Sequence, residues 1–171
     1  MDVQNGLQAE ELERTGPMLR AGTADDYTAL GETMFAAVRE GPSLYTERQR
    51  QAWVPAARSG EEWNARLGRQ EIILSERGQE IEGFMTLAEG GYIDFAFIRP
   101  ESQGTGLFRR LFEAIRQRAQ QHGFNRLWVH ASLTAKPAFS AMGFTILREE
   151  AVEVGGETLK RFEMEMTLPA Q

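Results

Sequence analysis

The stretch Phe97-Ile98-Arg99-Pro100-Glu101-Ser102-Gln103-Gly104-Thr105-Gly106-Leu107 joins an apolar strand to an amphipathic helix through a loop with two glycines. Glycines directly before a helix let backbone N–H groups approach a ligand closely, and the unpaired N–H groups at a helix start bind anions. Arg109 and Arg110 add positive charge to the first turns of the helix. The loop therefore predicts a site for a phosphorylated ligand, because arginine pairs well with phosphate. The alternative is a connection that the glycines merely shape.

Two common phosphate-binding motifs do not fit this loop. A Walker A loop ends in Lys and Ser or Thr, but Leu107 and Phe108 stand at these places. A dinucleotide fingerprint requires a third glycine, and Arg109 occupies that position. It also requires an acidic residue at the end of the next strand, where this chain has His130 and Ser132.

Apolar spacing extends the pattern outward from the loop in both directions. Downstream, Leu107, Leu111 and Ile115 recur at helical spacing, and Gly123 ends that helix. The other expected elements are a strand over residues 18–21, a helix between Thr23 and Gly41, helical pieces over 47–54 and 61–69, strands over 72–75, 81–87 and 92–98, a strand over 126–132, a helix over 135–142, and strands over 144–147 and 159–168. The three strands before the loop form an antiparallel meander, and the mixed order predicts an α/β (α+β mixed) fold.

Composition excludes several classes of site. The chain has no cysteine and two histidines, His122 and His130. Disulfides, thiolate metal sites and cysteine nucleophiles are therefore excluded, and a multi-histidine metal centre is disfavoured. We expect no metal.

Length and charge indicate one acidic domain. The chain has 171 residues and a net charge of −6, and domains typically have about 100–200 residues. We expect a flexible acidic tail over residues 1–16 and one domain over residues 17–171. Lysine occurs only as Lys136 and Lys160, so we expect no nucleic-acid partner. No apolar run approaches the roughly 20 residues that cross a bilayer, and no secretory signal is present, so we expect a cytoplasmic protein without a membrane partner.

The quoted stretch resembles the signature of the GNAT N-acetyltransferase superfamily, in which a hydrophobic strand end precedes Arg/Gln-x-x-Gly-x-Gly/Ala. Ala131-Ser132, Ala138-Phe139 and Met142-Gly143-Phe144 are similar to its second motif, a short helix that ends in Gly-Phe. The resemblance implies a central, mostly antiparallel mixed sheet of six to seven strands flanked by helices. It also implies transfer of an acetyl group from acetyl-CoA to a primary amine by direct attack, and a homodimer is a further expectation.

The resemblance implies an acetyl-CoA site around the loop. Backbone amides of residues 103–108 would bind the pyrophosphate. The main chain of Phe97 and Ile98 would pair with the pantetheine arm as an added strand. Arg109 or Arg110 would meet the adenosine 3′-phosphate. The implied cofactor-binding residues are Phe97, Ile98, Arg99, Gln103, Gly104, Thr105, Gly106, Leu107, Phe108, Arg109 and Phe139.

Amine acetylation requires a neutral amine, so a base must remove a proton. In the family this base often lies at places that match Tyr92 or Asp94, on the strand before the loop. His130, on the neighbouring strand, is a second candidate because imidazole has a pKa near 6.5. Trp53 and Trp63 fall in the region of the acceptor pocket. The alternatives are an exposed strand-end aspartate, a structural histidine and core tryptophans.

One position departs from the family pattern. The usual acid is a tyrosine four residues before the glycine of the second motif, and here Phe139 stands there. Phenylalanine has no proton to donate to the departing thiolate. A CoA-binding regulatory or interaction module with weak or no transferase activity is therefore an alternative, and a nucleotide-binding oxidoreductase is a third.

Overall fold

The computed structural model describes residues 18–170, and the tail expected over residues 1–16 lies outside them. The elements in chain order are β1 (Met18–Ala21), η1 (Ala24–Asp26), α2 (Tyr27–Arg39), α3 (Glu47–Trp53), α4 (Glu61–Gly68), β2 (Glu71–Arg77), β3 (Glu80–Leu87), η2 (Glu89–Gly91), β4 (Tyr92–Ile93), β5 (Ala96–Ile98), η3 (Pro100–Ser102), α5 (Leu107–Gln121), β6 (Arg126–Ser132), α6 (Lys136–Met142), β7 (Thr145–Val154) and β8 (Glu157–Thr167). No helix among these has the length and apolarity to cross a bilayer.

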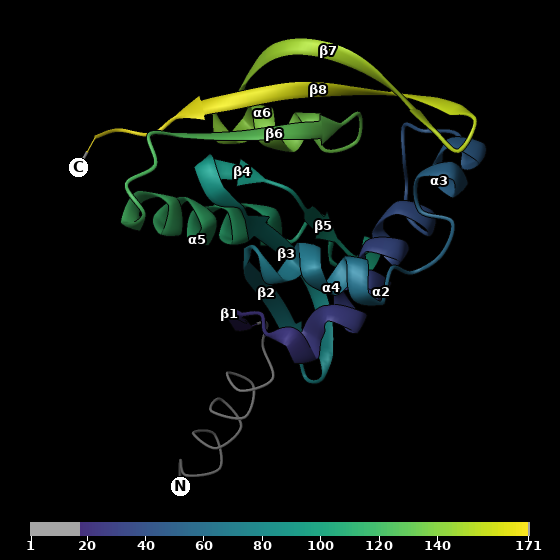
Figure 1. Ribbon diagram of the computed structural model, residues 1–171, viewed down its shortest axis with the longest axis horizontal. Coiled ribbons are helices and arrows are strands. Elements are labelled where there is room, and N and C mark those ends of the chain that lie inside the picture. The colour runs from purple at the N-terminus through teal and green to yellow at the C-terminus, as the bar shows by residue number, and fades with distance from the viewer. Residues whose placement is uncertain (1–17, 171) are drawn as a thin grey trace, which may run out of the picture.

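The eight strands within residues 18–170 form two sheets (Figure 1). One has the order β1-β2-β3-β5 and is antiparallel, which confirms the meander. The other has the order β4-β6-β8-β7, with β4 parallel to β6 and the remaining pairs antiparallel. The α/β fold class is confirmed, with eight strands divided between two sheets in place of six to seven in one.

The strand expected over residues 92–98 is broken in two, which corrects the sequence-based prediction. Tyr92 and Ile93 pair with β6, whereas residues 96–98 pair with β3. At the break the Phe95 N–H donates to Thr86 Oγ1 (3.0 Å), and the Thr86 N–H donates to the Phe95 carbonyl (2.9 Å). The chain therefore leaves the second sheet at this point and joins the first.

Helices cover both faces of the first sheet. Alternate residues of β2 point to opposite faces: Ile73 packs with the apolar side of α5, whereas Ile72 and Leu74 pack with α2 and α4. The apolar face of α5 also contacts Leu127 in β6, so one core joins the two sheets. The position of α5, and of the loop that precedes it, is therefore fixed by two sheets together.

The β7–β8 hairpin is longer than the sequence predicts. Strand β7 extends to Val154, whereas apolar residues predict only 144–147. Most of β7 is exposed, and a polar run at residues 148–150 interrupts its apolar pattern after Leu147. Cross-strand ion pairs accompany it, including Arg148 with Glu163 (2.6 Å) and Lys160 with Glu149 (2.8 Å).

Truncation of the α5 core is expected to destabilise the fold. Leu111 is fully buried between the two sheets. Leu111→Ala should lower the free energy of unfolding by roughly 2–5 kcal/mol, because it removes buried methyl groups and leaves a cavity. Urea denaturation monitored by circular dichroism measures this loss. Gln117→Ala, on the exposed side of the same helix, should change stability by less than about 0.5 kcal/mol, and equal losses in both variants would contradict this account of the core.

Candidate functional site

A groove of about 410 Å³ lies where the two sheets diverge. It is lined by Ala37, Val38, Pro42, Ser43, Trp53, Ala96, Phe97, Ile98, Ser102, Gln103, Gly104, Gly106, Leu107, Phe108, Arg109, Ser132, Thr134, Ala135, Ala138, Ala141 and Met142. Eight of the eleven predicted cofactor residues are therefore brought together along one groove: Phe97, Ile98, Gln103, Gly104, Gly106, Leu107, Phe108 and Arg109.

One edge of β5 has no neighbouring strand within the described part of the chain and faces this groove, and the Ile98 carbonyl on this edge accepts from Gln103 Nε2 (3.3 Å). The Arg99 N–H donates to the Glu82 carbonyl (2.8 Å), and the Phe95 carbonyl accepts from Thr86, so residues 95, 97 and 99 are the hydrogen-bonded positions of the β3–β5 ladder. The N–H and C=O groups of Ala96 and Ile98 consequently point away from β3. The main-chain groups of Phe97 face β3, whereas its side chain lines the groove.

The loop before α5 presents a series of unpaired donors. Within the described residues, the backbone N–H groups of residues 104–109 have no protein acceptor, and the next one, that of Arg110, donates to the Gly106 carbonyl (3.2 Å). Gly104 and Gly106 have φ angles of 74° and 83°, which side chains disfavour. The Thr105 hydroxyl donates to the Ser102 carbonyl (2.6 Å) and fixes the bend. Together with the 15-residue helix behind them, these donors form an anion cradle.

Arg99 lies outside the groove, contrary to its predicted place. Its Nε donates to the Ile81 carbonyl (2.8 Å), and its side chain lines a polar cavity of about 510 Å³ on another side of the loop. Thr105 and Arg110 line this cavity as well, so of the two arginines expected at the phosphate, Arg109 alone lines the groove.

A second cavity of about 190 Å³ continues from the groove. Residues that line both are Trp53, Ala96, Phe97, Ser132 and Ala135. The second cavity contains the three predicted catalytic side chains, Tyr92, Asp94 and His130. A ligand that enters along the groove therefore ends beside them.

Tyr92 and His130 form a hydrogen-bonded pair. Tyr92 comes from β4 and His130 from the adjacent β6, and the Tyr92 hydroxyl lies 2.9 Å from His130 Nδ1. Burial, followed by the charge of Arg161, lowers the pKa of His130 below 6.5. Burial and the nearby Asp94 carboxylate raise the pKa of Tyr92. At neutral pH the imidazole is therefore uncharged and able to accept a proton.

Asp94 is engaged in an ion pair. Arg66 donates to both carboxylate oxygens, at 2.7 and 2.8 Å, and Gln70 Nε2 donates to one of them at 2.7 Å. These bonds raise the pKa of the Arg66 guanidinium. Because three charge-assisted or polar donors occupy its oxygens, Asp94 holds Arg66 in place and is less available for proton transfer.

The aromatic candidates divide between cavity and core. Trp53 lines both cavities and its ring centroid lies 5.9 Å from that of Phe97. Trp63 is 4% exposed, its Nε1 donates to the Tyr27 carbonyl (2.7 Å), and it packs in the core away from both cavities. Phe139 is fully buried, lines the second cavity, and packs edge-on against Phe108, with centroids 5.0 Å apart.

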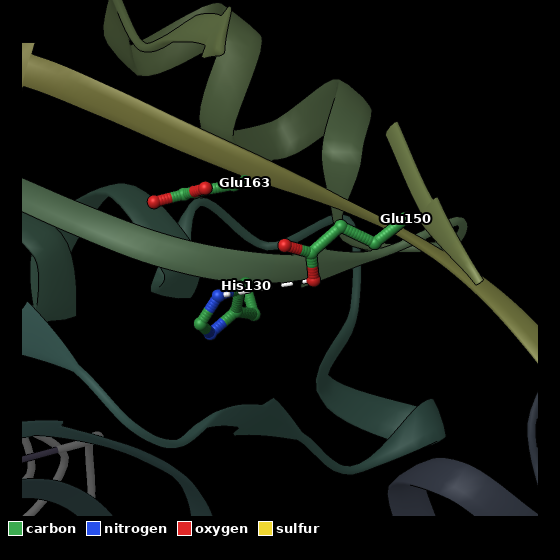
Figure 2. Close-up of side chains that lie close together, drawn as sticks. All are labelled: His130, Glu150 and Glu163. Atoms are coloured by element: carbon green, nitrogen blue, oxygen red, sulfur yellow. Dashed lines mark ion pairs between the residues drawn. The ribbon is translucent and has the colours of Figure 1, made fainter. Parts of the chain in front are cut away.

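His130, Glu150 and Glu163 place ligand atoms within 4.8 Å of one another (Figure 2). His130 Nε2 lies 4.0 Å from the Glu150 carboxylate. Both carboxylates are already paired with arginine: Arg161 with Glu150 (3.0 Å) and Arg148 with Glu163 (2.6 Å). This cluster is therefore an ion-pair network of the β7–β8 hairpin that flanks the imidazole.

The second cavity also contains three arginines that no sequence pattern indicates, Arg58, Arg66 and Arg161. They come from the loop after α3, from α4 and from β8. These three segments share no motif or regular residue spacing that would link them in the sequence. Their convergence is a property of the tertiary fold.

Comparisons with known proteins agree with this geometry. Residues 34–168 match the family model described as "Acetyltransferase (GNAT) domain". The curated "Uncharacterized N-acetyltransferase YafP" of Escherichia coli (strain K12) is 28% identical over 120 residues, which cover 70% of this chain and 75% of the relative. The crystal structure of "GCN5-Related N-acetyltransferase: Aminotransferase, Class-II" from Rhodopseudomonas palustris has a TM-score of 0.81 at 26% identity, covering 89% of this chain and 96% of that chain. The PaiA N-acetyltransferase from Thermoplasma acidophilum, solved with coenzyme A, shares the fold at a TM-score of 0.66, 15% identity, and coverage of 90% and 99%.

The lowered pKa of His130 can be measured directly. The C–H resonances of its imidazole, followed by NMR from pH 4 to 9, should titrate with a midpoint below about 6.5, because burial and Arg161 oppose the charged form. His130→Gln assigns the resonance by removing it, which leaves His122. A midpoint at or above that of a histidine in a model peptide would contradict the neutral state.

Proposed function

The chain belongs to the acetyltransferase (GNAT) domain family, and we propose that it transfers the acetyl group of acetyl-CoA to a primary amine by direct attack, without a covalent enzyme intermediate. The observation that carries this proposal is the junction of the two cavities. A groove with open backbone donors leads directly to a neutral histidine paired with a tyrosine. A relative of the same fold solved with coenzyme A supports the choice of co-substrate.

In this proposal, acetyl-CoA is held mainly by the backbone. The unpaired N–H groups of residues 104–109 bind the pyrophosphate, and Arg109 is the groove arginine available to a further phosphate. The free edge at Ala96 and Ile98 pairs with the amides of the pantetheine arm, as a peptide adds to a sheet edge. The acetyl group then lies toward the cavity junction.

The amine enters from the second cavity and must be neutral to attack. Its nitrogen forms a bond to the acetyl carbon, the carbon–sulfur bond breaks, and the amine proton passes to His130, directly or through the Tyr92 hydroxyl. The CoA thiolate leaves without a proton donor at position 139, which is a phenylalanine. Since a thiol has a pKa near 8.5, this leaving group is tolerable and takes its proton from solvent.

Phe139 favours a second candidate function, a CoA-binding module with weak or no transfer activity. A buried phenylalanine stands where the family pattern has its usual proton donor. The two candidates differ in one measurement, the release of free thiol from acetyl-CoA in the presence of a broad library of amines. Tight binding of acetyl-CoA without thiol release would favour the module.

The cradle should depend on the backbone at Gly106. Gly106→Ala is expected to weaken CoA binding about tenfold or more in isothermal titration calorimetry, because a side chain at φ 83° costs roughly 1–2 kcal/mol and turns the amides away. Gly123→Ala is the matched control: Gly123 also has a positive φ (77°) and open space around its α-carbon, but it ends α5. Equal loss of CoA affinity in both variants would refute the cradle.

Turnover should depend on His130 more than on Asp94. His130→Gln is expected to lower kcat by roughly 10²–10⁴-fold with the Kd of acetyl-CoA unchanged, because it removes the proton acceptor. The acid limb of the pH–rate profile should disappear with it. Asp94→Asn should retain that limb, since it alters the position of Arg66 and leaves the base. If Asp94→Asn abolishes the limb and His130→Gln preserves it, Asp94 is the base.

A further inference from the structure

The second cavity is positively charged although the chain is acidic. Its wall carries three guanidinium groups, Arg58, Arg66 and Arg161, and one carboxylate, Asp94, in a protein with a net charge of −6. Asp94 pairs with Arg66, and Glu150 in β7 pairs with Arg161. Arg58 remains.

Arg58 has no anionic partner among residues 18–170. Its side chain makes no ion pair or hydrogen bond with that part of the chain, and its guanidinium lies over the Trp63 ring, 5.9 Å from the centroid. Burial and the charge of Arg66 lower its pKa, and Asp94 and Glu62 offset this only in part. A half-buried cation without a partner is costly unless a ligand supplies the opposite charge.

The backbone of Arg58 is docked firmly. A β-carbon at Gly31 in α2 would lie 2.0 Å from the Arg58 carbonyl oxygen, so the loop after α3 rests directly on the helix backbone. Val54 at the start of this loop is fully buried, and Arg39 donates to its carbonyl (3.0 Å). The loop therefore carries Arg58 to the cavity from a fixed position.

We propose that the acceptor amine also carries an anionic group, a carboxylate or a phosphonate, and that Arg58 binds this group. The inference rests on the proposed transferase function, since it assigns the substrate class of the same site. Arg58 lines the second cavity and is absent from the groove wall, so its ligand is the acceptor and not CoA. A guanidinium matches both anions through two parallel hydrogen bonds.

The same charges act on the amine. Nearby cations disfavour an ammonium group, so they lower the pKa of a bound amine and increase its neutral, nucleophilic fraction. They also repel acceptors whose charges are all positive, such as polyamines. An amino acid or an aminoalkylphosphonate satisfies Arg58 while its amine faces the Tyr92–His130 pair.

The test compares matched acceptors in a thiol-release assay with acetyl-CoA. The panel contains the free L-amino acids, their carboxamides, aminoalkylphosphonates, and spermidine as a wholly cationic amine. We expect turnover with members that carry the anion and at least a tenfold lower kcat/KM for the matching carboxamide. Arg58→Gln should raise the KM for the anionic acceptor at least tenfold and leave the Kd of acetyl-CoA unchanged, and Arg58→Lys should restore part of the loss. Arg48→Gln, which removes an exposed arginine of α3, is the control and should behave as the wild type.

A binding measurement separates this inference from the proposed function. Saturation-transfer NMR reports binding of the same panel to the CoA-loaded protein without turnover. Arg58-dependent binding of anionic amines without thiol release would support the acceptor assignment and overturn the transferase. Turnover of spermidine or of carboxamides at rates that match the anionic members, unaffected by Arg58→Gln, would support the transferase and overturn the assignment. Absence of both release and binding overturns both.

Discussion

Residues 92–98 cannot hydrogen bond to β6 and to β3 along their whole length, because these strands belong to sheets that diverge. The chain resolves the conflict at Asp94 and Phe95: the Phe95 N–H donates to the Thr86 side chain, while the Phe95 carbonyl already accepts from the Thr86 N–H of β3. Before the break, Tyr92 lies beside β6 and reaches His130; after it, Ala96 and Ile98 keep an open edge. Both the open edge along the groove and the Tyr92–His130 pair in the second cavity follow from this one exchange of partners.

Those parts of the site that depend on neighbours in sequence could be predicted. The cradle needs only glycines before an amphipathic helix, and the strand over residues 126–132 is apolar at alternate places, so both agree with the structure. The break at Asp94 could not be predicted, since residues 92–98 have the composition of one continuous strand. Strand β7 carries a polar run at residues 148–150, where Arg148 forms an ion pair with Glu163 of β8, so the apolar signal in the sequence stops after Leu147. The place of the Arg99 side chain could not be predicted either, because its hydrogen-bond partner, the Ile81 carbonyl, lies on a different strand, β3.

The charges of the site are arranged so that one histidine stays neutral. Glu150 lies near the imidazole and favours its protonation, but Arg161 pairs with that carboxylate, and burial adds to the opposition. Asp94 is neutralised by Arg66 in a similar way. Acidic side chains elsewhere determine the net charge of the chain, whereas the cavity itself is dominated by guanidinium groups. Net charge alone would therefore mislead about which small molecules this protein attracts.

Gly31 gives a way to read related sequences. The backbone carbonyl of Arg58 occupies the space that any larger residue at position 31 would need. The residue at position 31 therefore constrains where the backbone of position 58 can lie. A relative that has alanine or valine in place of Gly31 has to shift the loop after α3, and with it whatever side chain stands at position 58. The residue at position 31 is thus informative about the path of the loop that carries position 58, and related chains can be sorted by the two positions taken jointly.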